Sequence, residues 1–204
     1  MATELKNLSS YDPSKVANGK GRRIGIVYAE WNNEITYALR DGAVKTLIEN
    51  GVEENDIELA SVPGSFELIF GASQMVKSNK YDAVIAIGCV IRGDTPHFDY
   101  ICEGVTAGLS KLNVEYDTPV IFGLITTNNL LQAQERSGGR LGNKGDECAV
   151  TALQMIAGFK SQRIDKASSD RSHAVWQSHT RAGHGKRALS MLKITALQMI
   201  AQFK

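Results

Sequence analysis

Four short apolar runs alternate with helical patterns through most of this chain, and this alternation limits the fold more than any other feature. The runs are rich in Ile and Val, as in strands buried on both faces. Between them, apolar residues recur three and four positions apart, as in amphipathic helices. Short turns between such elements predict an α/β fold with a four-stranded parallel sheet covered on both faces. We expect strands over residues 24–28, 56–60, 82–88 and 120–125, and helices over about 33–50, 65–76, 96–112, 128–135 and 146–159.

The loop that follows the third strand predicts an anion site. It reads G-C-V-I-R-G-D-T-P-H-F-D over residues 88–99 and leads from a strand end into a helix. Thr95 and Pro96 are expected as the N-cap and first residue of that helix, whose free N–H groups attract phosphate. His97 follows directly, and histidine titrates near neutral pH, which suits proton transfer. A lone histidine is often structural, but this position favours an enzyme acting on a small phosphorylated substrate.

Three further side chains are candidates because ligands bind outside the carboxyl ends of open parallel sheets. Trp31 could stack on a flat ligand or could be an ordinary core or rim residue. Glu67, after the Pro63-Gly64 turn, could accept N–H donors from a heterocycle or simply complement a helix dipole. Phe122 lies within a predicted strand and is a core residue by default.

Four cations on two glycine-rich segments favour an anion site over ordinary surface charge, since arginine matches phosphate oxygens with a planar fork. Neither segment has the pattern of a P-loop or of a dinucleotide-binding turn. The four are Arg92, Arg136, Arg140 and Lys144.

The cysteines and the apolar segments exclude several classes of protein. Cys89, Cys102 and Cys148 are an odd number and are not spaced like metal ligands, so we expect no metal site and a reducing compartment. No base is evident near Cys89, which argues against a nucleophilic role. Residues 1–20 contain no apolar signal segment, and no run is long enough to span a bilayer. We expect a cytoplasmic protein with no membrane partner.

Four motifs, in the same order, resemble the lumazine synthase (6,7-dimethyl-8-ribityllumazine synthase) family over roughly residues 15–160. The most specific is I-R-G-D-T-P-H-F-D-Y over residues 91–100. The others are P-G-S-F-E at 63–67, F-G-L-I-T at 122–126, and E-R at 135–136 with G-N-K-G at 142–145. The resemblance implies a flavodoxin-like three-layer sandwich and a cofactor-free condensation. The implied substrates are 5-amino-6-(D-ribitylamino)uracil and 3,4-dihydroxy-2-butanone 4-phosphate; the products are the lumazine, phosphate and water.

The resemblance also implies a role for each candidate residue. His97 matches the residue that transfers protons, and Asp94, Thr95 and Arg136 match positions that hold the phosphate. Asp94 would act through its backbone amide, because a carboxylate adds negative charge beside a phosphate. Phe122 matches a residue contributed by a neighbouring subunit. The positions implied to bind the uracil and the ribityl chain are Trp31, Ser65, Phe66, Glu67, Cys89, Val90, Ile91 and Phe122.

The implied partners are two small-molecule substrates and further copies of the chain. The family forms pentamers, and in many members twelve pentamers close into a shell. The glycine-rich break at 137–145 is short, which favours the sixty-subunit shell over a free pentamer.

The C-terminal segment departs from the family. We divide the chain into an N-terminal arm (1–20), a lumazine synthase-like domain (21–160) and an extension (161–204) with a basic linker and a duplicated terminal helix. Residues 1–160 carry a net charge of −5 and residues 161–204 one of +6, which together give the +1 of the whole chain. T-A-L-Q-M-I-A-G-F-K at 151–160 recurs at 195–204 with one change, Gly158 to Gln202.

Two other functions remain open from the sequence. The extension could belong to an engineered or natural shell scaffold whose basic tail binds nucleic acid or cargo, although such charge is usually just solvated. The domain could also be a different flavodoxin-like phosphate-handling protein, such as a flavin binder.

Overall fold

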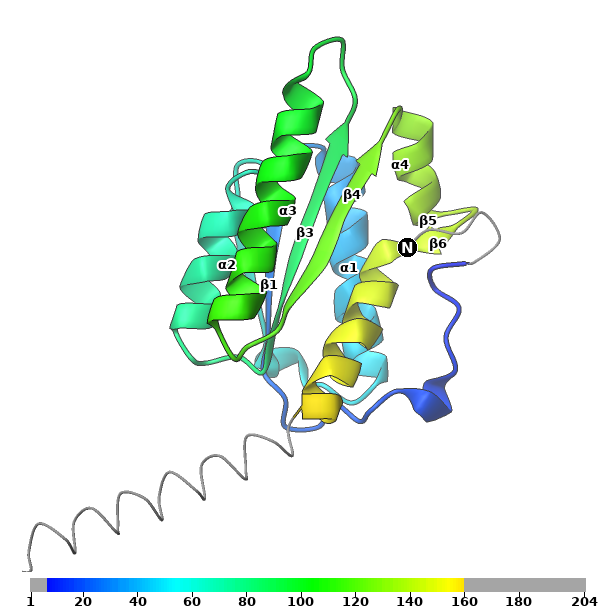
Figure 1. Ribbon diagram of the computed structural model, residues 1–204. Helices are drawn as coiled ribbons and strands as arrows, with labels where there is room; N and C mark the ends of the chain where they lie inside the picture. Colours follow the sequence, from blue (N-terminus) through cyan, green and yellow to red (C-terminus); the bar gives the residue numbers. More distant parts are fainter. Residues whose placement is uncertain (1–6, 160–204) are drawn as a thin grey trace, which may run out of the picture. The chain divides into compact units, whose positions relative to one another are not determined.

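A computed structural model describes residues 7–159 (Figure 1). The chain divides into two units, Met1–Gly158 and Phe159–Lys204, and nearly all described residues belong to the first. The predicted four-stranded parallel sheet is confirmed, with strand order β2-β1-β3-β4. The third and fourth strands continue past their predicted ends at residues 88 and 125. The strands are β1 (Ile24–Ala29), β2 (Ile57–Val62), β3 (Ala83–Ile91) and β4 (Val120–Thr127).

Helices cover both faces of the sheet, as in a flavodoxin-like three-layer sandwich. One face packs against α1 and a helix over residues 144–159, which is yellow in Figure 1, and the other against α2 and α3. The predicted C-terminal helical extension lies outside the described residues. The labelled helices are α1 (Asn33–Glu49), α2 (Leu68–Lys77), α3 (His97–Glu115) and α4 (Leu130–Arg136), with short 3-10 turns at Pro13–Lys15 and Glu54–Asp56.

Strand β3 shows why the core sequence has no polar alternation. Ile85 and Ile87 lie in the cluster beside α1, whereas Val84 and Ala86 lie in the cluster beneath α2 and α3. All four are fully buried. A central parallel strand with both faces covered is therefore a continuous apolar run.

The carboxyl ends of all four strands lie at one edge of the sheet. Tyr28 of β1 is in register with Ser61 of β2 and Ile87 of β3, and Ile91 of β3 pairs with Thr127 of β4. The connection from β3 to α3 projects beyond the sheet at this edge (Figure 1). The loops that carry most of the candidate residues therefore leave the sheet at the same edge.

The glycine-rich break after α4 forms a two-stranded antiparallel hairpin, β5 (Ser137–Gly139) and β6 (Gly142–Asn143). The N-terminal segment lies along it, with the Leu8 N–H donating to the Leu141 carbonyl at 2.7 Å. None of the helices in residues 7–159 is long and apolar enough to cross a membrane.

Candidate active site

The loops after β1 and β2 are joined by backbone hydrogen bonds. The Glu30 N–H donates to the Val62 carbonyl at 2.8 Å, and the Trp31 N–H donates to the Pro63 carbonyl at 3.1 Å. Asn32 follows in the left-handed conformation, with φ of 60°, which asparagine tolerates better than most residues. The Trp31 side chain is 74% exposed. A core role for Trp31 is therefore wrong in the single chain, and its ring is available at the carboxyl edge.

The Cys89 carbonyl at the end of β3 joins three loops. It accepts hydrogen bonds from Asn32 Nδ2 at 3.0 Å and from the buried Ser65 Oγ at 3.4 Å. Gly88 permits this approach, because a Cβ there would lie within 3 Å of Ser65 Oγ and of two leucine side chains. The structure thus brings together three of the predicted elements: the Trp31 loop, Ser65 and the end of β3.

The Cys89 thiol is unsuited to nucleophilic chemistry. It is only 2% exposed, and burial raises its pKa to about 12. The thiol is therefore protonated at neutral pH. Val90 and Ile91 are half-buried at the same strand end, on opposite faces of the sheet.

The segment over residues 65–67 is a turn and not the predicted first turn of a helix. Helix α2 begins at Leu68, and Glu67 occupies the N-cap without a capping side-chain hydrogen bond. Glu67 is exposed, and Phe66 is 51% exposed, with its ring facing Gly104 of α3. Both side chains are accessible for ligand contact, and the Glu67 carboxylate lies back over Gly64 of the turn.

The expected capping by Thr95 is wrong. Helix α3 begins at His97 with Pro96 in the N-cap, and no side chain caps it. The N–H groups of Asp99 and Tyr100 donate to the Pro96 carbonyl instead, at 3.0 and 3.3 Å. The helix therefore starts one residue later than predicted, which leaves the Thr95 hydroxyl without a capping role.

The predicted phosphate and proton-transfer residues of this loop are all accessible. Asp94, Thr95 and His97 are exposed. The structure places these three within one short segment at the carboxyl edge.

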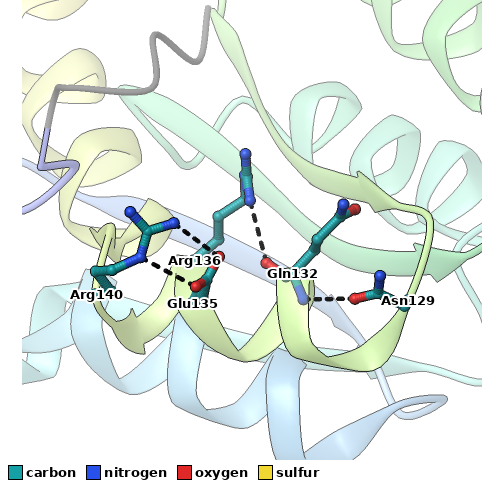
Figure 2. A network of polar contacts seen from close by, with 5 residues as sticks. All are labelled: Asn129, Gln132, Glu135, Arg136 and Arg140. Carbon is teal, nitrogen blue, oxygen red and sulfur yellow. Dashed lines mark hydrogen bonds and ion pairs between the residues drawn. The ribbon is translucent and has the colours of Figure 1, made fainter.

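The four predicted cations are not equivalent. Within residues 7–159, three of them pair with carboxylates and Arg136 forms no ion pair; its Nη1 donates to the Gln132 carbonyl at 3.2 Å (Figure 2). Three of the four cations thus face a carboxylate within the described residues. Arg136 has no such ion pair there, although its charge contributes to the lowered pKa of the adjacent Glu135. The pairs are Arg92 with Asp99 at 2.7 Å, Arg140 with Glu135 at 3.1 Å, and Lys144 with Glu147 at 2.7 Å.

Phe122 and Arg136 lie away from the other candidates within one chain. Phe122 pairs with Ala86 in mid-strand, about 16 Å along β4 from Thr127. Arg136 ends α4, roughly 10 Å along the helix from its start near the strand end. Phe122 is 40% exposed on an edge strand, so its default assignment to the core is wrong for the single chain.

Sequence reasoning missed two residues that shape the site. Asn32 reads as a helix cap, but its side chain reaches Cys89. Asp99 does not stand out in the sequence, although a carboxylate in the first turn of α3 is the natural partner for Arg92 at the start of the same loop. In the described residues no group of three or more His, Cys, Asp or Glu side chains is placed to hold a metal ion.

These features define a class: an open parallel α/β protein with an exposed aromatic ring, a histidine and the start of a helix at the carboxyl edge of its sheet, the edge where such sheets bind ligands. Residues 21–160 match the sequence model of 6,7-dimethyl-8-ribityllumazine synthase. The chain belongs to the 6,7-dimethyl-8-ribityllumazine synthase family.

Several curated relatives carry that name. The protein of Phocaeicola vulgatus is 60% identical over 156 residues, which are 76% of this chain and 93% of the relative. The protein of Bacteroides fragilis is 62% identical over 134 residues, 66% of this chain and 94% of the relative. The protein of Parabacteroides distasonis is 54% identical over 156 residues, 76% of this chain and 98% of the relative.

Proposed function

We propose that this chain condenses 5-amino-6-(D-ribitylamino)uracil with 3,4-dihydroxy-2-butanone 4-phosphate to 6,7-dimethyl-8-ribityllumazine, phosphate and water, a step of riboflavin biosynthesis. The observation that carries the proposal is the family match over residues 21–160, with relatives of that name at 54–62% identity. It favours this enzyme over the scaffold and flavin-binding alternatives. The reaction needs positioned reactants and proton transfers, and no redox cofactor.

The phosphate of the four-carbon substrate would bind at the β3–α3 loop. The backbone amides of Asp94 and Thr95 lie just before the positive end of the α3 dipole, which favours an anion. Arg136, without an ion pair in residues 7–159, would complete the charge balance. His97, the first residue of α3, would transfer protons between the two substrates. Phosphate is then a leaving group held beside an imidazole.

The pyrimidine would bind where the three loops meet. The exposed Trp31 ring offers a stacking surface, and Glu67 can accept N–H donors from the heterocycle. The remaining predicted contacts come from the turn after β2, the end of β3 and the edge strand: Ser65, Phe66, Cys89, Val90, Ile91 and Phe122.

The positions of two candidate residues, Phe122 and Arg136, support a site shared between subunits. Phe122 and Arg136 lie too far along their elements to reach the carboxyl edge of their own chain. A neighbouring copy could supply both, which agrees with a homo-oligomer. We propose a pentamer, with the sixty-subunit shell favoured by the short hairpin over residues 137–143, acting in the cytoplasm.

We propose the division into arm (1–20), domain (21–160) and extension (161–204), and the repeated segment bears on the boundary between domain and extension. In the first copy the inward residues Ala152, Leu153 and Ile156 are buried, whereas Gly158 has open space around it. The one change in the second copy, at Gln202, thus corresponds to an outward position.

The residues that precede the two copies differ more than the copies themselves. Leu189 and Lys193 stand where Gly145 and Ala149 stand before the first copy. Ala149 is fully buried, and a Cβ on Gly145 would collide with the Leu39 carbonyl. The second copy therefore cannot replace the whole helix. Removal of residues 161–204 should leave turnover and oligomer size unchanged; loss of either would overturn this division.

The direct test is incubation of the full chain with both substrates and detection of lumazine absorbance. His97→Ala should lower kcat at least about tenfold while the oligomer stays intact, because one proton-transfer group is removed. Lys45→Gln, on the exposed face of α1, is the control and should match the parent. A parent that forms no lumazine, or that instead quenches free FMN, would overturn the function. A His97→Ala variant as fast as the parent would overturn only the role of His97.

A further inference from the structure

The loop over residues 92–97 is held by few contacts. A Cβ on Gly93 would have no atom within 4 Å, and Asp94 and Thr95 are exposed. At its start, the Arg92 N–H donates to the Thr127 carbonyl at 2.8 Å and so extends the β3–β4 ladder. Residues 93–95 form no hydrogen bond with any other part of the described chain. The backbone alone therefore leaves this loop poorly fixed.

The Arg92 side chain closes the loop. Its Nη2 lies 2.7 Å from Asp99 Oδ1 and its Nη1 lies 3.3 Å from Asp99 Oδ2, so the guanidinium and the carboxylate meet as two forks. Its Cζ lies 4.1 Å from the centroid of the Phe98 ring. Such a fork fixes orientation as well as distance, which a lysine ammonium would not. We call this contact the Arg92–Asp99 clasp.

The Arg92–Asp99 clasp closes the loop that carries the candidate phosphate-binding and proton-transfer residues. Asp94, Thr95 and His97 all lie between Arg92 and Asp99 in the sequence, and the cation–π contact with Phe98 fixes the residue next to His97. Many exposed ion pairs contribute little to global stability. A pair that closes a short, otherwise weakly held loop acts on local geometry instead, where a displacement of about 1 Å can cost up to roughly 10²-fold in rate.

We propose that Arg92 and Asp99 are positioning residues, which hold the β3–α3 loop in the geometry that binds the phosphate substrate and orients His97. The proposal rests on the proposed function. It gives the two arginines different roles, because Arg92 is engaged by Asp99 and shapes the loop, whereas Arg136 is left to contact the phosphate.

The test uses Arg92→Gln and Asp99→Asn in the full chain. Each should raise KM for the four-carbon phosphate about three- to tenfold and speed hydrogen exchange in a peptide covering residues 92–100. KM for the pyrimidine should stay unchanged, because its predicted contacts all lie outside residues 92–100. Arg92→Lys, which keeps the charge but loses the fork, should fall between the parent and Arg92→Gln.

Glu115→Gln is the matched control, since it removes the exposed Lys111–Glu115 pair (3.6 Å) from the same helix, far along it from the loop. It should match the parent in every measurement. Unchanged exchange and unchanged KM for the phosphate substrate in Arg92→Gln would overturn the proposal. A fall in kcat with both KM values and the exchange of the 92–100 peptide unchanged would also overturn it, because the loss would then not come from a loosened loop. If the parent forms no lumazine, the function fails, and the exchange measurement still tests the clasp.

Discussion

Two segments of this chain, the loop over residues 88–97 and the glycine-rich break over 137–145, share glycines and cations but differ in structure. Both combine glycines with cations near a helix end. The first projects from the sheet edge and is closed by the single Arg92–Asp99 clasp. The second is fixed to three separate parts of the domain. Glycine content alone therefore does not distinguish a ligand loop from a structural joint.

Asn143 shows how the second segment is fixed. Its Nδ2 donates to the Ala38 carbonyl of α1 at 2.8 Å, its Oδ1 accepts from the Gly145 N–H at 2.8 Å, and its own N–H donates to Ser9 Oγ at 2.8 Å. Gly145 in turn lies directly against the backbone of α1. This segment joins the N-terminal arm, α1 and the helix over residues 144–159, so its geometry is set by packing.

The largest difference between the segments should appear on adding one methyl group. In Gly145→Ala the new Cβ would collide with the Leu39 carbonyl. Two further backbone atoms of α1 lie 2.8–2.9 Å from this Cβ, and no change of rotamer can move backbone atoms. We expect a loss of about 3 kcal/mol in the free energy of unfolding, measured by urea denaturation.

Gly93→Ala is the matched substitution in the other segment. Its Cβ would meet nothing within 4 Å, so we expect a change of no more than about 0.5 kcal/mol. Equal losses in both variants would show that the first loop is packed as tightly as the second, and would break the comparison.

Side-chain removal should give the same contrast with a smaller effect. Asn143→Ala leaves the buried Gly145 N–H without its partner and removes the side-chain hydrogen bond to the Ala38 carbonyl, and we expect a loss of about 2 kcal/mol in the free energy of unfolding. Thr95→Ala removes a hydroxyl that forms no hydrogen bond within residues 7–159 and should leave this free energy unchanged. A Thr95→Ala loss as large as that of Asn143→Ala would contradict the contrast.

The sequence predicts the strands and helix starts, because these depend on the local pattern of residues. The buried run at 83–88 and the loop that follows it are visible because burial on both faces requires continuous apolar residues, and because Thr-Pro indicates a helix start. Contacts across a loop are less visible. The pairing of Arg92 with Asp99 depends on where the chain returns, which no periodicity records.

Placement relative to the sheet edge is also hidden from the sequence. Phe122 reads as core because β-strand interiors are usually covered on both faces, but β4 is an edge strand and leaves the ring 40% exposed. Three of the four predicted cations are engaged by nearby carboxylates, which sequence distance alone does not reveal. The missing information in each case is three-dimensional adjacency.

The smallest expected effect is a change in hydrogen-exchange protection when the pH is lowered. It tests whether loss of an ion pair loosens one segment and not the other. The Arg92 guanidinium lowers the pKa of Asp99, and the Arg140 guanidinium lowers the pKa of Glu135. A carboxyl with a lowered folded pKa contributes stability above its unfolded pKa and loses that contribution as the pH falls through the folded pKa. Both pairs should therefore persist from pH 9 to about 5 and weaken only below about pH 4.

Hydrogen exchange, corrected for the intrinsic rate at each pH, should then separate the segments. The peptide over residues 92–100 should loosen when Asp99 is protonated, because the clasp is the main side-chain contact that closes the loop. The peptide over residues 137–143 should stay protected when Glu135 is protonated, because Asn143 and the Leu8–Leu141 hydrogen bond still hold it. Parallel loosening of both peptides would mean that ion pairing, and not packing, fixes the hairpin.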